Sequence, residues 1–146
     1  MKIDKVYTEN AKKVDTKDHQ GNPNGWLMEM FKDETNVKTE VYLSAAFPGA
    51  FKGYHLHRVR AARYVCLKGK MRIITYELVD GKWLRSENIL EPGKKMFIPK
   101  DIATGLENIG DEEGWLVNYP DPAYDPNLKD EQVEYSQEEL EKGIVK

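Results

Sequence analysis

Residues 53–58 read GYHLHR, and this stretch places two histidines on one short apolar segment. Because successive side chains of a β-strand point to opposite faces, His55 and His57 would project from the same face of a strand. Two imidazoles on one face can bind a ligand together, or one of them can transfer a proton. The segment therefore predicts a strand that carries a functional site.

Short runs rich in Val, Ile, Tyr, Phe and Leu lie on both sides of this stretch and are separated by turn residues. Such spacing is typical of an antiparallel sandwich or barrel. Asp80-Gly81 is a strong signal for a two-residue hairpin, and Gly69 stands where a second hairpin would need a positive φ. An all-β fold is therefore expected. The predicted strands are WLMEMF (26–31), TEVYLSAAF (39–47), ARYVCL (62–67), MRIITYEL (71–78), KWLRSENIL (82–90), KMFIP (95–99) and GWLVNY (114–119).

The two ends of the chain are more polar than its middle. KIDKVYT (2–8) predicts a first strand, and residues 9–25, rich in Gly, Pro, Asn and Asp, predict an irregular surface segment. Ser136 precedes QEE, a capping box that opens a short C-terminal helix, which Gly143 can end. The charged run 129–142 is expected to form a solvated face.

Length and composition narrow the class of protein. A chain of 146 residues predicts a single domain over residues 1–146. Its net charge of −3 argues against nucleic-acid binding, so a small-molecule partner is expected. Cys66, the single cysteine, allows no intrachain disulfide and is expected in the core. Since the first thirty residues resemble neither a signal peptide nor a membrane span, a cytoplasmic protein is predicted.

The residues around GYHLHR follow the spacing of the two sequence motifs of the cupin superfamily. The glutamate of the first motif would fall at Ala62, and the histidine of the second at Thr104. The resemblance implies a cupin (jelly-roll) β-barrel of antiparallel strands. The matching positions are Gly49, His55, His57 and Gly69 in the first motif, and Gly93, Pro99 and Asn108 in the second.

The two substituted positions bear on metal binding. A metal cupin of this pattern would use three histidines and a carboxylate, and Ala62 and Thr104 leave two of those four ligands. Transition-metal sites normally keep at least three protein ligands, so neither a metal nor a cofactor is predicted. A metal cupin, such as a dioxygenase or a sugar-phosphate isomerase, stays open as an alternative in which Glu29 or Glu77 completes the site.

Without a metal, the expected chemistry is proton transfer beside a carbonyl. An imidazole with an ordinary pKa near 6.5 can take a proton at physiological pH. A neighbouring cation would stabilise the enolate that forms. The groups expected to face the pocket beside the two histidines are Arg63, Arg72, Glu77 and a late tyrosine.

Several segments resemble one cupin branch, the dTDP-4-dehydrorhamnose 3,5-epimerases and the related dTDP-sugar 3,4-ketoisomerases. NGWLMEMF (24–31) resembles the RGxxxExF nucleotide-binding segment of that family, with Asn24 in place of arginine and Glu29 kept. KGYH (52–55) resembles its RGxH, with Lys52 in place of arginine and the catalytic base at His55.

The remaining matches lie further along the chain. ARYV (62–65) resembles the family's cationic residue before an apolar pair, which implies that role for Arg63. FIPKDIATGLEN (97–108) is similar to the family's IPxGFAHGF. NYPDPAYDP (118–126) resembles its tyrosine-bearing segment, with Tyr124 as the better match and Tyr119 as the second.

The resemblance implies a metal-independent epimerase of nucleotide-activated 4-keto-6-deoxy sugars. His55 would be the general base, Tyr124 the acid on the opposite face, and His57 a further catalytic group. Two alternatives stay open: a 3,4-ketoisomerase, which also has two histidines on this strand, and a non-catalytic sugar-binding cupin. A homodimer is also implied, with residues 2–8 crossing to the partner. The expected substrate-binding residues are Asn24, Glu29, Lys52, Arg63, Arg72 and Tyr119.

Overall fold

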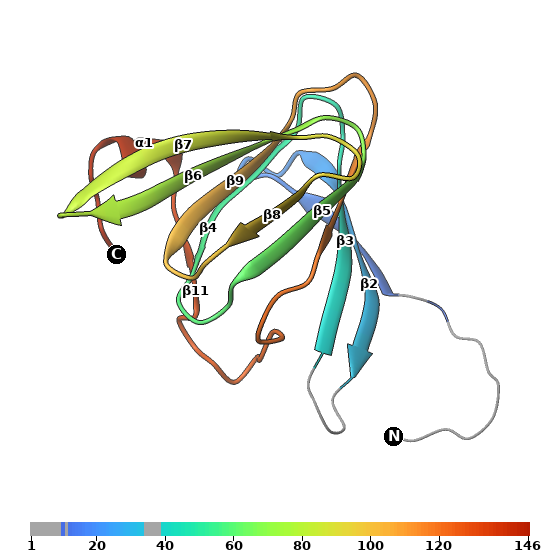
Figure 1. Cartoon of the computed structure of the whole chain (residues 1–146), viewed down its shortest axis with the longest axis horizontal. Coiled ribbons are helices and arrows are strands. Elements are labelled where there is room, and N and C mark those ends of the chain that lie inside the picture. The colour runs from blue at the N-terminus through green and yellow to red at the C-terminus, as the bar shows by residue number, and fades with distance from the viewer. Residues whose placement is uncertain (1–9, 11, 34–38) are drawn as a thin grey trace.

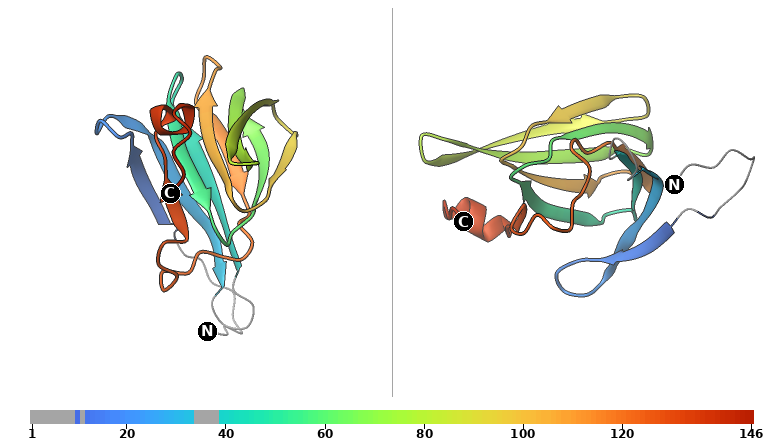
Figure 2. Two further views of the ribbon diagram at one scale, coloured as in Figure 1. Left: turned by 90° about the vertical axis from the view of Figure 1, so that its left-hand side faces the viewer. Right: turned by 90° about the horizontal axis from the view of Figure 1, so that it is seen from below.

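The computed structural model describes residues 10, 12–33 and 39–146, which form two antiparallel sheets packed face to face (Figures 1 and 2). The predicted all-β jelly roll is confirmed. In spatial order, the six-stranded sheet contains β1 (Lys12–Lys17), β2 (Pro23–Asp33), β3 (Thr39–Ala46), β10 (Gly114–Asn118), β5 (Ala62–Lys68) and β8 (Lys95–Ile98). The five-stranded sheet contains β11 (Gln132–Glu134), β4 (Phe51–His57), β9 (Ile102–Asn108), β6 (Met71–Val79) and β7 (Lys82–Leu90).

The apolar runs of the sequence all lie in strands, but the N-terminal part differs from expectation. Residues 9–25 are not an irregular segment throughout, because β1 pairs with β2 along its length. Most side chains of β1 are exposed, so its sequence has no apolar alternation to reveal it. Backbone pairing at the edge of the sheet forms the strand instead. The strand predicted over residues 2–8 lies outside the described residues.

Of the two hairpins predicted at glycine turns, one is present and the other is not. Asp80 and Gly81 both have positive φ, 51° and 77°, and they close the β6–β7 hairpin as predicted. Gly69 has the expected positive φ of 86°, but β5 and β6 belong to different sheets, so the predicted second hairpin is wrong. A Cβ on Gly69 would lie 2.9 Å from the Cα of Gly114, which shows how closely the chain turns between the sheets.

The main core lies between the sheets. Cys66 is fully buried there, as predicted, beside residues such as Ile73 and Leu116. A second apolar cluster lies on the outer face of the five-stranded sheet and includes Tyr54 and Ile74. The five-stranded sheet is thus covered on both faces.

The C-terminal segment covers that outer face. The short helix α1 (Gln137–Glu141) begins at Ser136 with the predicted capping box, and Gly143 follows it with φ 77°. Residues 129–142 are not a solvated face throughout, because Tyr135 and Leu140 are buried in the outer cluster. Pairing of β11 with β4 holds this segment against the sheet, as the red segment beside β4 in Figure 1 shows. In the described part of the chain, no helix has the length and apolar character that a membrane crossing requires.

Candidate active site

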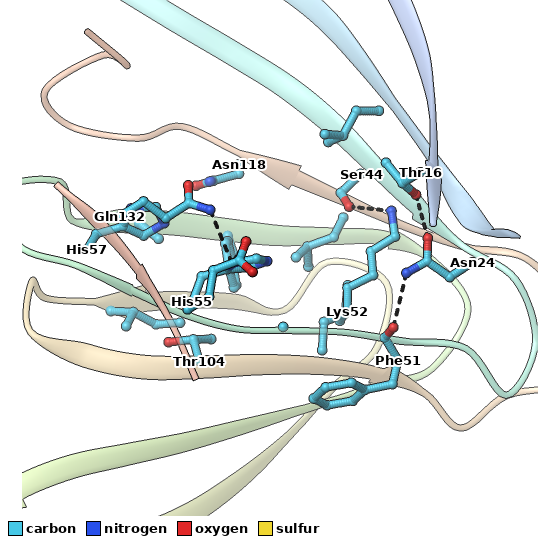
Figure 3. A pocket seen from close by; sticks show the side chains of 18 of the residues that line it. Thr16, Asn24, Ser44, Phe51, Lys52, His55, His57, Thr104, Asn118 and Gln132 are labelled. Carbon is cyan, nitrogen blue, oxygen red and sulfur yellow. Dashed lines mark hydrogen bonds and ion pairs between the residues drawn. The ribbon is translucent and has the colours of Figure 1, made fainter. Parts of the chain in front are cut away.

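A cavity of about 800 Å³ lies between the two sheets. Strands β4 and β9 line one wall, and β2, β3, β5 and β10 line the other. A volume of this size suits a small-molecule ligand. Figure 3 shows polar side chains in two groups along the cavity, with His55 and His57 in one group and Lys52 in the other.

A bulge at Gly53 brings these three side chains to the same face of β4. The β4–β9 register shifts between Lys52 and His55, so the usual alternation of side chains is interrupted there. Phe51 and Tyr54 lie together on the outer face, with ring centroids 5.0 Å apart. Gly53 itself has φ 128°, and a Cβ on it would lie 2.7 Å from the carbonyl oxygen of Thr104. Only glycine suits this position.

His55 lies opposite Thr104 on β9 and beside residues of β11. The amide Nε2 of Gln132 lies 3.2 Å from Nδ1 of His55, and Oε1 of Glu134 lies 3.7 Å from the same nitrogen. Burial lowers the pKa of His55 below its ordinary value, while the charge of Glu134 partly opposes that change. The imidazole is therefore neutral at pH 7 and can accept a proton.

His57 contacts a buried ion pair. Nε of Arg60 donates to Oε1 of Glu131 over 2.7 Å, and the two side chains are 8% and 6% exposed. Nδ1 of His57 lies 3.1 Å from a terminal guanidinium nitrogen of Arg60 and 3.2 Å from Oε1 of Glu131. Burial and then the charge of Arg60 lower the pKa of His57. Both imidazoles are thus neutral at physiological pH.

Lys52 reaches from β4 to the opposite sheet. Its Nζ donates to Oγ of Ser44 over 3.2 Å and to the carbonyl oxygen of Trp26 over 3.3 Å. Burial lowers the pKa of Lys52 to about 8, although the charge of Glu113 partly opposes this change. Among the described residues, no carboxylate lies within ion-pair distance of the ammonium. A half-buried cation with only neutral oxygen partners favours an anionic or electron-rich ligand group.

The opposite wall offers phenols and amides. Nδ2 of Asn118 donates to the hydroxyl oxygen of Tyr42 over 2.7 Å, so the Tyr42 proton remains available to a ligand. Burial raises the pKa of Tyr42, which keeps this phenol protonated. Asn24 accepts from Oγ1 of Thr16 over 2.6 Å and donates to the carbonyl oxygen of Phe51 over 3.1 Å.

Four of the predicted site residues line this cavity, and five do not. The cavity contains the two histidines together with Lys52 and Asn24. The five predicted residues outside its lining are Glu29, Arg63, Arg72, Tyr119 and Tyr124.

The five other residues have partners elsewhere. Arg63 pairs with Asp121 over 3.1 Å, and Arg72 pairs with Glu87 and Glu107. Tyr124 is 46% exposed, and the guanidinium of Arg60 lies 5.1 Å from its ring centroid. Through Arg60, which does line the cavity, Tyr124 lies one side chain away from it. Tyr119 is exposed at the end of the six-stranded sheet, and Glu29 of β2 pairs in register with Lys12 and Tyr42.

The donors present do not fit a transition-metal site. Ala62 and Thr104 both line the cavity at the positions where the cupin pattern would have ligands, and a methyl group and a hydroxyl are poor substitutes. Neither Glu29 nor Glu77 reaches the cavity lining. Across residues 12–33 and 39–146, no three His, Cys, Asp or Glu side chains gather in a way that could hold a metal ion.

Sequence patterns did not reveal several residues in and behind the cavity wall. Glu131 is buried although it lies in a charged run that is typical of solvated surface. Tyr42 lies in an apolar strand where packing is its ordinary role, and only the register of the sheet shows that it faces the cavity. Arg60 offered one signal, a cation three residues after His57.

This combination of fold and site defines a class. The fold is the cupin fold: the cupin-2 domain protein Rru_A2000 from Rhodospirillum rubrum superimposes with a TM-score of 0.68 at 15% identity, over 96% of this chain and 86% of that one. The chain belongs to the family described as polysaccharide biosynthesis C-terminal domain, whose model matches residues 19–132.

Two further proteins resemble this chain. The probable low-salt glycan biosynthesis epimerase Agl13 of Haloferax volcanii is 31% identical over 135 residues, which cover 84% of this chain and 86% of that protein. The capsular polysaccharide assembling protein CapF of Staphylococcus aureus has the same fold, with a TM-score of 0.70 and 19% identity over 87% of this chain. The chain spans about a third of the length of CapF, 32%.

Proposed function

We propose that the protein is a sugar epimerase that acts on a nucleotide-activated 4-keto-6-deoxy sugar. One observation carries the proposal: the neutral imidazole of His55 shares a cavity with the ammonium of Lys52 and the phenol of Tyr42. The 31% identity to a protein named a probable glycan biosynthesis epimerase supports this class of reaction. The dTDP-linked sugar comes from the family resemblance alone.

The reaction begins with proton abstraction beside the keto group. His55 takes the proton from that carbon, and the electron pair of the C–H bond moves to the carbonyl oxygen to give an enolate. A cation or a hydrogen-bond donor in the cavity stabilises the enolate oxygen. Return of a proton to the opposite face of the same carbon then gives the epimer and restores the carbonyl. No metal takes part in these steps.

Epimerisation needs an acid on the face opposite the base. His55 belongs to the five-stranded sheet, whereas Tyr42 belongs to the facing sheet, and both line the cavity. Tyr42 therefore supports the proposal as an acid. Tyr124 remains the candidate that the family resemblance implies, and its position beside Arg60 requires a substrate that reaches beyond the cavity lining.

Substrate binding is divided along the cavity. Lys52 and Asn24 lie at the end away from the histidines (Figure 3), where an anionic group of the substrate would be bound. Contacts from Glu29, Arg63, Arg72 and Tyr119 to the nucleotide remain a proposal for parts of the substrate that extend outside the cavity.

Proton NMR in D₂O tests the proposal directly. Protein incubated with dTDP-4-keto-6-deoxyglucose should introduce deuterium at C3 and C5, and His55→Ala should abolish the exchange while unfolding at a similar temperature. Tight binding without exchange would instead support a non-catalytic sugar-binding cupin. Full exchange with His55→Ala would rule out the proposed base.

A 3,4-ketoisomerase is the second candidate. Its support is the pair of histidines on one face of β4, because a base on one face can move a proton between adjacent carbons through an enediol without inversion. The same experiment separates the two reactions. Exchange at C3 together with migration of the carbonyl would identify the ketoisomerase.

A homodimer is also proposed. Strand β1 is the edge of the six-stranded sheet, and an exposed edge strand favours pairing with another chain. Sedimentation velocity would show a species of twice the mass of 16.9 kDa. A monomer at micromolar concentration would contradict this proposal without affecting the proposed reaction.

A further inference from the structure

An ion pair between Arg60 and Glu131 lies behind His57. Glu131 precedes β11 and Arg60 follows β4, so the pair joins segments 71 residues apart in the chain. Oε1 of Glu131 accepts from Nε of Arg60 over 2.7 Å. Oε2 accepts from the backbone N–H groups of Val59 and Arg60 over 3.2 and 3.3 Å. The carboxylate thus has donors on both oxygens without a proton from the His57 ring.

Arg60 can only donate hydrogen bonds to its neighbours. A guanidinium carries only donors and stays protonated in proteins. Its terminal nitrogen lies 3.1 Å from Nδ1 of His57 with the N–H directed at that atom, beside the Nε–H that binds Glu131. Two neighbouring donors of the fork therefore use Oε1 and Nδ1 as their two acceptors. A proton on Nδ1 could reach Oε1 of Glu131, 3.2 Å away, but it would also face an N–H of arginine at 3.1 Å.

His55 has different neighbours. Gln132 places its amide Nε2 beside Nδ1 of His55, while its Oε1 accepts from Arg60 over 3.4 Å, and a half-turn of the amide would exchange the donor for an acceptor. Glu134 offers an acceptor 3.7 Å from the same ring nitrogen. The β4–β11 register places Glu134 opposite His55 and Gln132 opposite His57. Nδ1 of His55 can therefore donate or accept, and its Nε2 can be left free as a base.

We infer that Arg60 and Glu131 are positioning residues that hold His57 as the neutral tautomer with its proton on Nε2. His57 then presents an N–H to the cavity and acts as a hydrogen-bond donor to a substrate oxygen, while His55 keeps the proton-accepting role. The tautomer follows from the contacts alone. Its catalytic consequence rests on the proposed function.

The tautomer can be measured without substrate. The chain has three histidines, so a long-range ¹H–¹⁵N correlation spectrum of protein labelled at histidine resolves six ring nitrogens. Spectra of His19→Gln and His55→Gln assign the His57 signals by elimination. At pH 7, we expect Nε2 of His57 to have the shift of a protonated nitrogen and Nδ1 that of an unprotonated one. A proton on Nδ1, or on both nitrogens, would overturn the inference.

Variants test whether the ion pair sets the tautomer. The double variant Arg60→Met, Glu131→Leu removes both charges together and leaves neither one buried alone. Its His57 signals should move toward averaged values of the two tautomers. Arg58→Met is the matched control, because the exposed side chain of Arg58 donates to the backbone carbonyl of Lys146 over 2.7 Å and makes no hydrogen bond to His57 among the described residues. Unchanged His57 signals in the double variant would contradict the role of the pair. If that variant does not fold, Arg60→Lys keeps a cation beside Glu131 but removes the guanidinium fork, and unchanged His57 signals in it would likewise contradict the role of Arg60.

Activity measurements on two variants test whether His57 is a donor and His55 the base. Glutamine retains an N–H donor but no basic nitrogen, so His57→Gln should keep activity within about 10-fold, whereas His55→Gln should lose about 100-fold or more. Equal losses would contradict the division of roles. Absence of exchange in the wild-type protein would reject the proposed function and leave the tautomer result standing.

Discussion

The ammonium of Lys52 on β4 donates to the hydroxyl oxygen of Ser44 on β3, in the facing sheet, over 3.2 Å. Because this ammonium has only neutral oxygen partners among the described residues, it costs folding free energy that a bound anion would recover. A destabilising group in a cavity is typical of a binding site.

Lys52→Met should therefore stabilise the protein at pH 7. Burial lowers the pKa of Lys52 from 10.5 to about 8, so between these values the unfolded chain binds more protons than the folded one. Stability contributed by this group rises with pH from about 8 to 10.5, and it is lowest below pH 8. The shift corresponds to an increase of about 2 kcal/mol after an allowance for partial exposure. Urea unfolding at pH 7 and pH 10 measures it.

The matched control is Lys82→Met, at an exposed position in β7. It should leave the pH dependence of the unfolding free energy unchanged. Equal behaviour of the two variants would show that Lys52 is not desolvated by the fold.

Glu131→Gln should destabilise the protein most near neutral pH. Burial acts to raise the pKa of this carboxyl, but the hydrogen bond and charge of Arg60 outweigh it and hold the pKa at about 2. The folded-state pKa lies below the ordinary 4.5, so the stabilisation is present above pH 4.5 and is lost as the pH falls toward 2. Its size is about 3 kcal/mol. Unfolding free energies from pH 2 to pH 7 should converge for variant and wild type at the acid end.

Glu138→Gln provides the comparison for that measurement, since Glu138 is 72% exposed and its ion-pair partner among the described residues is Lys142, which follows α1. We expect a change below about 0.5 kcal/mol. A similar loss in both variants would mean that Glu131 contributes no more than a surface charge.

Gly53→Ala should disrupt the bulge that directs Lys52 and His55 into the cavity. The new Cβ would lie 2.7 Å from the carbonyl oxygen of Thr104 and 2.9 Å from Cα of Gly105, both backbone atoms that cannot move alone. Gly21→Ala is the control, because Gly21 also has positive φ, 87°, but open space around it. We expect a loss of about 1 kcal/mol for Gly21→Ala and at least about 3 kcal/mol for Gly53→Ala, measured by urea unfolding. Equal losses would show that the close approach at Gly53 has no role.

The sequence predicts the sheet much better than the cavity. Alternating apolar runs and the Asp80-Gly81 turn are local signals, and they found the strands of the central part of the fold. Edge strands such as β1 depend on backbone pairing with a neighbour, which leaves no side-chain pattern to read. The cavity depends on register over long separations. Glu131 meets Arg60 only because β11 pairs with β4, and nothing local distinguishes its carboxylate from the surface charges around it.

The pH profile of proton exchange tests the two histidines together. Burial lowers the pKa of His55, so protonation should inactivate the base only below its ordinary value of 6.5. The acid limb of kcat/KM therefore lies below pH 6.5. Because the charge of Glu134 raises the pKa of His55, Glu134→Gln should move that limb to still lower pH. A limb that moves upward would contradict the contact at 3.7 Å as an electrostatic interaction.

A pair of tyrosine variants distinguishes the two candidate acids. Tyr42 lines the cavity on the sheet opposite His55, and Asn118 donates to its oxygen, which leaves its proton for a substrate. Tyr124 is exposed beside Arg60. If Tyr42 is the acid, Tyr42→Phe should reduce formation of the epimer by about 100-fold. Deuterium exchange at the same carbon should persist, since His55 can still remove and return a proton on its own face.

Tyr124→Phe should then alter both rates by less than about 3-fold, well below the contribution of a general acid. The opposite result, with epimer formation lost only in Tyr124→Phe, would assign the acid to the segment after β10 and require the substrate to pass Arg60. Equal loss of exchange and epimer formation in Tyr42→Phe would mean that Tyr42 positions the substrate, because removal of an acid alone leaves the proton abstraction by His55 intact.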